Sequence, residues 1–265
     1  MNLTSTLIIA TYNWPEALDL VLISVRNQKV FPSEVIIADD GSKEDTKQLV
    51  ENYQKDFPVP LHHVWHEDVG FTKSIILNKA IAKASGHYII QVDGDCIVHP
   101  QFVKDHLKFA ASNVYLFGSR VTIKKEFLPI LFSTKKVNFS PFSKGIKKRT
   151  RALHVPLFGK LYGTSAEFSK KYRGCNTSFF KSDFIAVNGY NEDFKGWGRE
   201  DSELAIRFLN YGLSARRLRY LGIVYHIFHV EKPKDRLEIN NDIEATTIAK
   251  KVKFCKNGVD KYLLN

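Results

Sequence analysis

The first 111 residues alternate four times between a short apolar run and a segment with apolar residues at helical spacing. The runs are nearly continuous and rich in β-branched residues, which is typical of strands buried in a parallel sheet. Repeated strand–helix units place helices over both faces of such a sheet. The pattern predicts an α/β protein with a single doubly wound, mostly parallel sheet flanked by helices. Its strands are expected at 6–11, 34–39, 61–66 and 88–92, and its helices at 15–28, 46–53, 75–81 and 100–111.

The alternation breaks after residues 115–123. Residues 124–173 form a basic stretch with scattered aromatic side chains. No internal repeat, low-complexity tract or linker divides the chain, so we expect a single domain over 1–265 with an insertion at 124–173. The later predicted elements are strands at 173–180 and 218–228 and a helix from about Glu200 to Gly212.

The excess positive charge of the chain is confined to that insertion. The chain carries 39 Lys and Arg against 28 Asp and Glu, a net charge of +11. Residues 124–173 hold 13 of these bases and two of these acids, so the rest of the chain is neutral overall. An excess of this size attracts anionic partners such as nucleic acid, phosphate groups, acidic glycans or a membrane surface.

Three interpretations of the insertion stay open at this point. It could be a mobile, solvated loop. It could grip an anionic acceptor, such as a uronic acid polymer, a sialylated glycan or a lipid diphosphate. It could also dock on an anionic membrane surface, because the apolar segment 127–132 precedes clustered bases at 135–136 and 144–151.

Acidic residues follow two of the predicted strands. Asp39-Asp40 ends the second strand, and Asp93-Gly94-Asp95 ends the fourth. Ligands of open α/β sheets bind outside the carboxyl ends of the strands, and alternate carboxylates suit a divalent cation such as Mg²⁺ or Mn²⁺. No GxGxxG or GxxxxGK[ST] motif is present, so a dinucleotide-binding or P-loop protein loses its main support. Lys73 could hold a phosphate instead.

A second acidic cluster, Glu200-Asp201, stands directly after Gly196-Trp197-Gly198. Two acids at a helix start are stabilised by the helix dipole, so simple capping is one interpretation. The glycines allow close backbone approach, and the Trp197 indole is a suitable platform for a sugar face. We therefore favour a site in which one of the two carboxylates is a general base.

The histidines and cysteines carry weaker signals. His226 and His229 could be core histidines with satisfied hydrogen bonds, or one of them could join Asp95 in binding a metal. The three cysteines (Cys96, Cys175 and Cys255) lack metal-binding spacing and are expected to be buried thiols in a reduced, cytoplasmic protein. The first apolar run is too short for a signal peptide, and no apolar run is long enough to span a membrane.

Together these motifs resemble the family 2 glycosyltransferases of the GT-A fold, in a branch with bacterial chondroitin-type synthases and a galactosyltransferase-like C-terminal module. The resemblance covers about 5–123 and 172–230. It implies a nucleotide-sugar-binding half at about 1–123 and an acceptor and catalytic half with a C-terminal tail at 174–265. The motifs that carry it are Thr11-Tyr12-Asn13, Asp39-Asp40-Gly41-Ser42, Asp93-Gly94-Asp95 and Gly196-Trp-Gly-Arg-Glu-Asp201, with further matches at 67–71, 173–179 and 188–194.

The resemblance also implies roles for individual residues. Asp201 would be the catalytic base, with Trp197 and Glu200 orienting the acceptor. Asp95 and His226 would bind Mn²⁺ or Mg²⁺, with His229 as the alternative ligand. The residues that would contact the nucleotide-sugar are Ala10, Thr11, Tyr12, Asp39, Asp40, Lys73, Asp93 and Gly94, with Asp39 or Asp40 on the uracil ring and Asp93 near the ribose.

One position departs from the family pattern. Leu77 stands before Asn78, where the family often has an arginine, so Lys73 is left to supply positive charge.

The reaction implied by the resemblance is an inverting, metal-dependent transfer. A hexose or N-acetylhexosamine would move from a UDP-sugar to a hydroxyl of a glycan or lipid-linked acceptor in surface polysaccharide or lipopolysaccharide synthesis. The enzyme would work in the cytoplasm, and membrane docking through 124–173, one of the three open interpretations of the insertion, would place it at the inner face of the cell membrane. Two alternatives are a sugar-phosphate nucleotidyltransferase and a non-enzymatic nucleic-acid-binding protein, although the neutral remainder of the chain gives no reason to expect nucleic acid.

Overall fold

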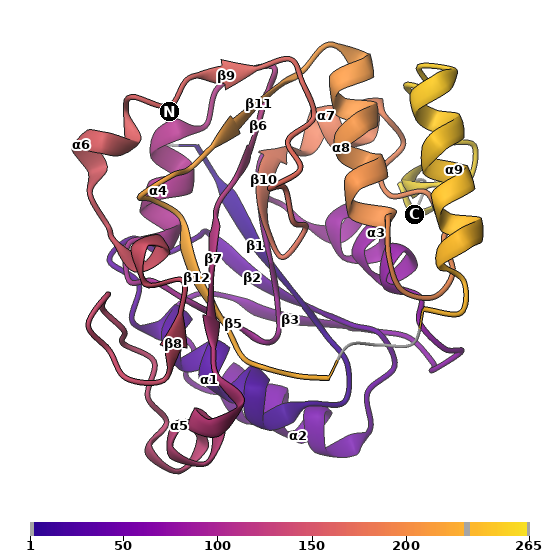
Figure 1. Ribbon diagram of the computed structural model, residues 1–265. Helices are drawn as coiled ribbons and strands as arrows, with labels where there is room; N and C mark the ends of the chain where they lie inside the picture. The colour runs from indigo at the N-terminus through magenta and orange to yellow at the C-terminus, as the bar shows by residue number, and fades with distance from the viewer. Residues whose placement is uncertain (1–2, 231–233, 264–265) are drawn as a thin grey trace.

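The computed structural model describes residues 3–230 and 234–263, and its largest element is an eight-stranded mixed sheet (Figure 1). The first four strands in its order run parallel, while β10 runs antiparallel to both of its neighbours. The four predicted strands are confirmed to within one residue at each end. The order is β3 (Leu61–Trp65), β2 (Glu34–Asp39), β1 (Ser5–Thr11), β4 (Tyr88–Asp93), β10 (Asn176–Phe180), β6 (Val114–Phe117), β11 (Ser214–Arg217) and β9 (Thr164–Ser165).

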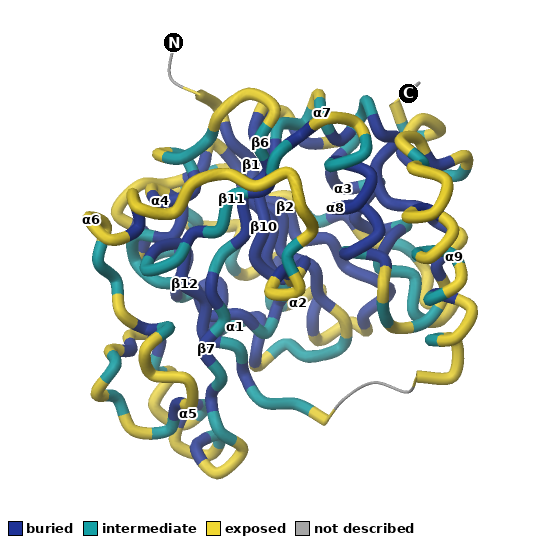
Figure 2. Tube along the Cα trace, turned by 45° about the horizontal axis from the view of Figure 1, so that its top comes forward, coloured by how far each residue is buried: buried dark blue, intermediate teal, exposed yellow. Residues whose placement is uncertain are grey.

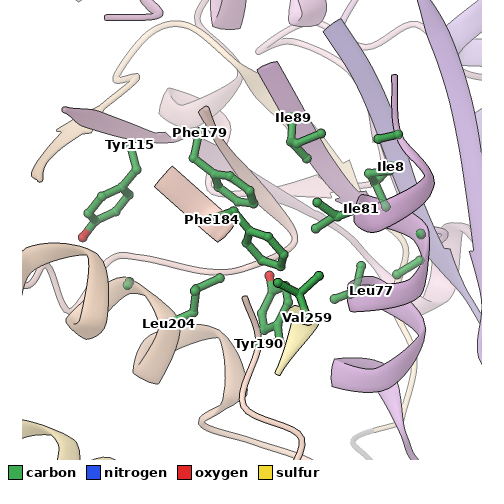
Figure 3. Close-up of a cluster of buried hydrophobic side chains, with 14 of the residues drawn as sticks. Ile8, Leu77, Ile81, Ile89, Tyr115, Phe179, Phe184, Tyr190, Leu204 and Val259 are labelled. Carbon is green, nitrogen blue, oxygen red and sulfur yellow. The ribbon is translucent and has the colours of Figure 1, made fainter. Parts of the chain in front are cut away.

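Helices cover both faces of this sheet, as predicted. One layer consists of α1 (Pro15–Arg26), α2 (Glu44–Gln54) and α4 (Phe102–Phe109), and the other of α3 (Lys73–Lys83), α7 (Lys181–Ala186) and α8 (Glu200–Tyr211). Strand β1 contributes side chains to the cores on both faces of the sheet, because successive side chains of a strand point to opposite faces. Leu7 and Ile9 pack under the first layer, and Ile8 packs under the second, where Figure 3 shows it near Leu77 and Ile81.

A second, four-stranded sheet was not predicted. Its order is β5 (Cys96–Val98), β12 (Ile223–His226), β7 (Ser119–Ile123) and β8 (Ile146–Lys147). The chain leaves the main sheet after β6, where Gly118 N–H donates to Asn176 O at 3.0 Å, and β7 then pairs with β12. The strand predicted at 218–228 is shorter than expected, because only the residues of β12 pair with β5 and β7.

The insertion at 124–173 is folded, so its interpretation as a solvated loop is wrong. It contains η1 (Lys125–Phe127), α5 (Leu128–Thr134), η2 (Arg149–Ala152) and α6 (Pro156–Gly159). Its apolar side chains form a third core against the second sheet and α1. Phe127 and Leu131 belong to this core, so they are not available to the apolar docking face that one of the three interpretations placed at 127–132, although Ile130 is exposed.

The C-terminal region packs back onto the main domain. Helix α9 (Leu237–Ala249) lies against α8, with its outer face exposed (Figure 2). Val259 of η3 (Val259–Tyr262) enters the core beside α3. The three cysteines are buried and free, as predicted. None of the described helices is both long and apolar enough to cross a bilayer.

Candidate active site

Strand register brings the predicted acidic motifs to one edge of the main sheet. Thr11 at the end of β1 is paired with Asp39 of β2, and Ala10 is paired with Asp93 of β4. The carboxyl ends of three neighbouring parallel strands therefore meet at one place. This is the position at which open α/β sheets bind ligands.

A cavity of about 360 Å³ lies at this edge. Ten of the thirteen predicted site residues line it, and the three others are Asp39, His226 and Asp201. The predicted residues that line this cavity, which we call the donor cavity, are Ala10, Thr11, Tyr12, Asp40, Lys73, Asp93, Gly94, Asp95, Trp197 and Glu200.

Of the two adjacent acids after β2, only Asp40 lines the cavity. Asp39 is fully buried, accepts a hydrogen bond from Ser42 N–H at 2.8 Å and lies 2.9 Å from His63 Nε2. Asp40 is held by the Thr72 hydroxyl at 2.6 Å and the Thr72 N–H at 2.9 Å. Asp39 is therefore enclosed by protein groups, whereas Asp40 borders the cavity.

Asp95, His226 and His229 form a compact trio beside the donor cavity. Pairing of β12 with β5 sets His226 opposite Cys96, and Ile227 N–H donates to Asp95 O at 2.8 Å. Asp95 Oδ2 lies 3.4 Å from His226 Nε2 and 3.2 Å from His229 Nε2. One ligand atom from each residue lies within 4.8 Å of the others. Both histidines thus reach Asp95, including the one that the sequence pattern ranked second.

The protonation of the trio suits a divalent cation. Burial alone would raise the pKa of Asp95, but His226 and His229 hold it at about 2, so the carboxylate is ionised. Burial lowers the pKa of His226, which favours the neutral imidazole that binds metals. One carboxylate and two imidazoles fit Mn²⁺ better than Mg²⁺, which prefers oxygen ligands alone.

Lys73 is already paired within the cavity. Its Nζ lies 2.6 Å from Asp93 Oδ1. Burial alone would lower the pKa of Lys73, but the charge of Asp93 outweighs it and raises the pKa well above the usual range. Lys73 was expected to face a phosphate, but its ammonium group is already paired with the Asp93 carboxylate.

Glu200 is the first residue of α8, directly before Asp201, and it lines the donor cavity together with Lys73. It is buried, and its Oε2 has no hydrogen-bond partner among the described residues. Burial, followed by the neighbouring charge of Asp201, raises the pKa of Glu200 to about 7. A buried carboxyl with such a pKa at a cavity wall is typical of a functional site.

The loop before α8 explains the Gly-Trp-Gly sequence. Gly196 and Gly198 have φ values of +71° and +108°, a region that residues with a Cβ rarely adopt. Helix α9 holds the loop, because Asn240 Nδ2 donates to Gly198 O at 2.9 Å. Trp197 lies between these glycines, half-exposed on the wall of the donor cavity.

Asp201 lies in a second cavity of about 670 Å³ that adjoins the first. Lys73, Asp93, Trp197 and Glu200 line both cavities, whereas Asp201 lines only the second. We call the second one the acceptor-side cavity.

Sequence reasoning missed several residues of the donor cavity. Trp14 packs edge-on against His229, with ring centroids 6.2 Å apart, and Phe71 and Ile76 line the wall. Trp14 comes three residues after the end of the first strand, so its position near the sheet edge was a usable signal. Ile76 gave no such signal in the sequence, because its helical spacing is the one expected of a core residue.

Solved glycosyltransferases have the same architecture. GalNAc-T7, solved with UDP, GalNAc and Mn²⁺, aligns with a TM-score of 0.63 and 17% identity, over 86% of this chain and 44% of that one. Residues 1–349 of TarS from S. aureus, in complex with UDP, align with a TM-score of 0.60 and 18% identity, over 94% of this chain and 68% of that one. The predicted GT-A fold is thereby confirmed.

The chain belongs to glycosyl transferase family 2, whose sequence profile matches residues 6–167. A second profile, the N-terminal domain of galactosyltransferase, matches residues 164–230. The predicted resemblance is confirmed. Most of the basic insertion, for which we found no family motif, lies within the first match.

Curated relatives include polysaccharide synthases. Chondroitin synthase of Escherichia coli is 26% identical over 83% of this chain and 34% of its own length. Hyaluronan synthase of Pasteurella multocida is 27% identical over 89% of this chain and 25% of its own length. Validoxylamine A glucosyltransferase of Streptomyces hygroscopicus subsp. limoneus is 26% identical over 78% of this chain and 48% of its own length. The chain thus spans half or less of the length of these relatives.

Proposed function

We propose that this chain transfers a hexose or N-acetylhexosamine from a UDP-sugar to a hydroxyl of a glycan or lipid-linked acceptor, with inversion at the anomeric carbon. The observation that carries the proposal is the pair of adjoining cavities, one lined by Asp40, Asp93 and Asp95, with His226 beside it, and the other lined by Asp201. Family membership favours glycosyl transfer over the nucleotidyl transfer that also fitted the sequence.

The donor cavity supplies separate contacts for the parts of a nucleotide-sugar. Asp40 faces the region expected to take the uracil ring, and Asp93 the region expected to take the ribose. Tyr12 is fixed across the opening because its hydroxyl donates to Asp68 Oδ2 at 2.8 Å. The presence of UDP and Mn²⁺ in the GalNAc-T7 structure supports a donor of this type.

Asp95, His226 and His229 would hold the divalent cation. When bound, Mn²⁺ supplies Lewis-acid neutralisation of the charge on a departing diphosphate. The chain's own contribution is the ionised Asp95 and the neutral His226, set in place by the β5–β12 pairing.

The transfer step uses the first turn of α8. An acceptor hydroxyl in the acceptor-side cavity loses its proton to Asp201, and its oxygen forms a bond to the anomeric carbon. The bond from that carbon to the diphosphate oxygen breaks on the opposite face, so UDP leaves with the electron pair and the configuration inverts. Trp197 and Glu200 line both cavities and orient the acceptor sugar beside the donor.

The relatives named chondroitin synthase and hyaluronan synthase support a role in polysaccharide synthesis. We propose that this is surface polysaccharide or lipopolysaccharide synthesis at the cytoplasmic side of the cell membrane. The proposed contact with an anionic membrane through 124–173 no longer rests on the apolar segment 127–132, because Phe127 and Leu131 are buried.

A donor screen tests the proposal. The purified chain is incubated with Mn²⁺ and, in turn, UDP-glucose, UDP-galactose, their N-acetyl forms and UDP-glucuronate, and UDP release is measured. GDP-mannose is the mismatched nucleotide. We expect release from one of the hexose or N-acetylhexosamine donors and its loss in Asp201→Asn.

The outcomes separate the parts of the proposal. Release from no donor, with any acceptor, would overturn the assigned activity. Release of GDP in preference to UDP would overturn the donor class. The configuration of the new bond, read by NMR, tests inversion, since an α-linked donor must give a β-linked product.

A further inference from the structure

Five cations lie close to one another, although they come from four separate parts of the chain, and two of them, Arg120 and Arg173, line the acceptor-side cavity. They lie on β7, on η2 and the residue before it, before β10, and between β11 and β12. We call them the basic strip: Arg120, Lys148, Arg151, Arg173 and Arg219.

Hydrogen bonds bring three of the four parts of the strip together. Arg151 Nη1 donates to Arg120 O at 3.1 Å, which fixes η2 over β7. Val155 N–H donates to Tyr220 O at 3.1 Å, which brings the segment after η2 beside Arg219. Arg173 Nη1 donates to Lys170 O at 3.0 Å. The folded insertion therefore places its own cations, such as Arg151, beside Arg120 and Arg219 of the main chain fold.

Positive charge predominates in the strip, although the charge of Asp95 acts on Arg120. In the part of the chain that the structure describes, none of its five side chains forms an ion pair with a carboxylate. Partial burial lowers the pKa of Arg151, and the charges of Arg219, Arg120 and Arg173 lower it further. Like charges held together without an ion-paired acid are costly, and an anionic ligand would relieve that cost.

The position of the strip indicates the ligand. Arg120 and Arg173 line the acceptor-side cavity together with Asp201, and none of the five lines the donor cavity. A flat membrane surface cannot enter a cavity, and Arg120, which lines this one, is half-buried, as is the neighbouring Arg151. A flexible chain with anionic groups can place one end at Asp201 and run outward along the strip.

Resting on the proposed function, we propose that the basic strip is an acceptor subsite for an anionic glycan, whose carboxylate or phosphate groups bind the strip while its terminal sugar lies at Asp201. The guanidinium groups of Arg120, Arg151 and Arg173 suit either group, because they donate two parallel hydrogen bonds to carboxylate or phosphate oxygens. Three of the five cations, Lys148, Arg151 and Arg173, belong to the insertion, so this part of its excess charge would select the acceptor.

Binding without donor tests the subsite apart from catalysis. Fluorescently labelled oligogalacturonate, oligo(glycerol phosphate) and a neutral maltooligosaccharide of matched length are titrated with the protein at two salt concentrations. We expect one or both anionic probes to bind, more weakly as salt rises, and the neutral probe to bind at least about tenfold more weakly. The two anionic arms distinguish carboxylate from phosphate.

Matched variants locate the binding. Arg151→Gln with Arg173→Gln should weaken the anionic probe at least about tenfold, since each loses a charge-assisted hydrogen bond. Lys125→Gln with Lys144→Gln removes the same charge from exposed positions of the same insertion and should leave binding unchanged. If the arginine variant fails to fold, Lys148→Gln, an exposed residue, carries the test with an expected severalfold loss.

Three results would overturn the subsite. One is equal binding of the neutral and anionic probes, and another is equal loss in the strip and control variants. The third is tighter binding of phosphatidylglycerol vesicles or a single-stranded oligonucleotide than of either anionic glycan. A separate measurement of UDP release from a donor alone distinguishes failure of the subsite from failure of the proposed function. A protein that binds the glycan but releases no UDP contradicts only the proposed function.

Discussion

The backbone N–H of Gly174 donates a hydrogen bond of 2.6 Å to Asp201 Oδ2. This bond joins the start of β10 to the first turn of α8, and Ser202 N–H holds the other carboxylate oxygen at 2.7 Å. Asp201 is therefore fixed in orientation, while Oε2 of the adjacent Glu200 has no hydrogen-bond partner in the part of the chain that the structure describes. Two neighbouring acids at one helix start differ in environment, so their roles are separable by mutation.

Asp201→Asn should lower the transfer rate by about 10²–10⁴-fold, the contribution of a general base. The amide keeps the shape of the side chain but cannot take the proton of the acceptor hydroxyl. Steady-state kinetics with varied acceptor measures kcat, and UDP titration checks that nucleotide binding is kept.

Glu200→Gln is the matched variant for this assignment. Glu200 is proposed to orient the acceptor, so its loss should raise KM for the acceptor more than it lowers kcat. A larger fall in kcat for Glu200→Gln than for Asp201→Asn would make Glu200 the base instead.

Gly174→Ala should impair transfer by displacing Asp201. A Cβ at position 174 would lie 2.6 Å from Asp201 Cβ, which is too close for carbon atoms. Because that Cβ is attached directly to α8, the helix start must shift, at a cost of about 1–3 kcal/mol. Gly163→Ala is the control, since nothing lies within 4 Å of its added Cβ. Measured unfolding free energies and UDP release that match for the two variants would contradict this account.

Removal of divalent cations should abolish activity, and Mn²⁺ should restore it better than Mg²⁺. The reason is the donor set, because two of its three atoms are imidazole nitrogens. His226→Ala and His229→Ala should each weaken Mn²⁺ binding, measured by calorimetry, by at least about tenfold. His62→Ala is the control at an exposed position outside the donor cavity. Unchanged Mn²⁺ affinity in either site variant would remove that histidine from the ligand set.

The sequence was most informative where local pattern and function coincide. Four apolar runs located four parallel strands, and the acids that follow them had to meet at one edge once the strands were aligned. The sequence could not predict which of Asp39 and Asp40 faces the cavity. Adjacent side chains at a strand end face opposite ways, and the partners that enclose Asp39 come from other segments of the chain.

The second sheet and the folded insertion were missed for a different reason. Strand β12 is defined by pairing with β5 and β7, which are far away in the sequence. Phe127, Phe139 and Ile146 are spaced irregularly and bury themselves against α1 and this sheet, so no periodic pattern marks them as core. Non-local pairing of this kind leaves no signal in a single sequence.

The raised pKa of Glu200 makes a prediction about stability. Its folded pKa is about 7, against 4.5 for an ordinary glutamate. Between these values the folded protein binds a proton that the unfolded chain does not, so this group favours folding at low pH, and the advantage is lost as pH rises through about 7. His99 and His106 act in the opposite sense, because burial lowers the pKa of each to about 4.

Glu200→Gln should therefore remove one component of the pH dependence. We expect the unfolding free energy of the native protein, relative to the variant, to fall by on the order of 3 kcal/mol between pH 5 and pH 8. Urea unfolding of both proteins without metal or donor measures this difference, and the contributions of His99 and His106 cancel because both proteins keep them. A difference that stays flat or rises with pH would show that Glu200 is ionised in the folded protein at neutral pH. Its burial beside Asp201 would then be offset by the charge of Lys73.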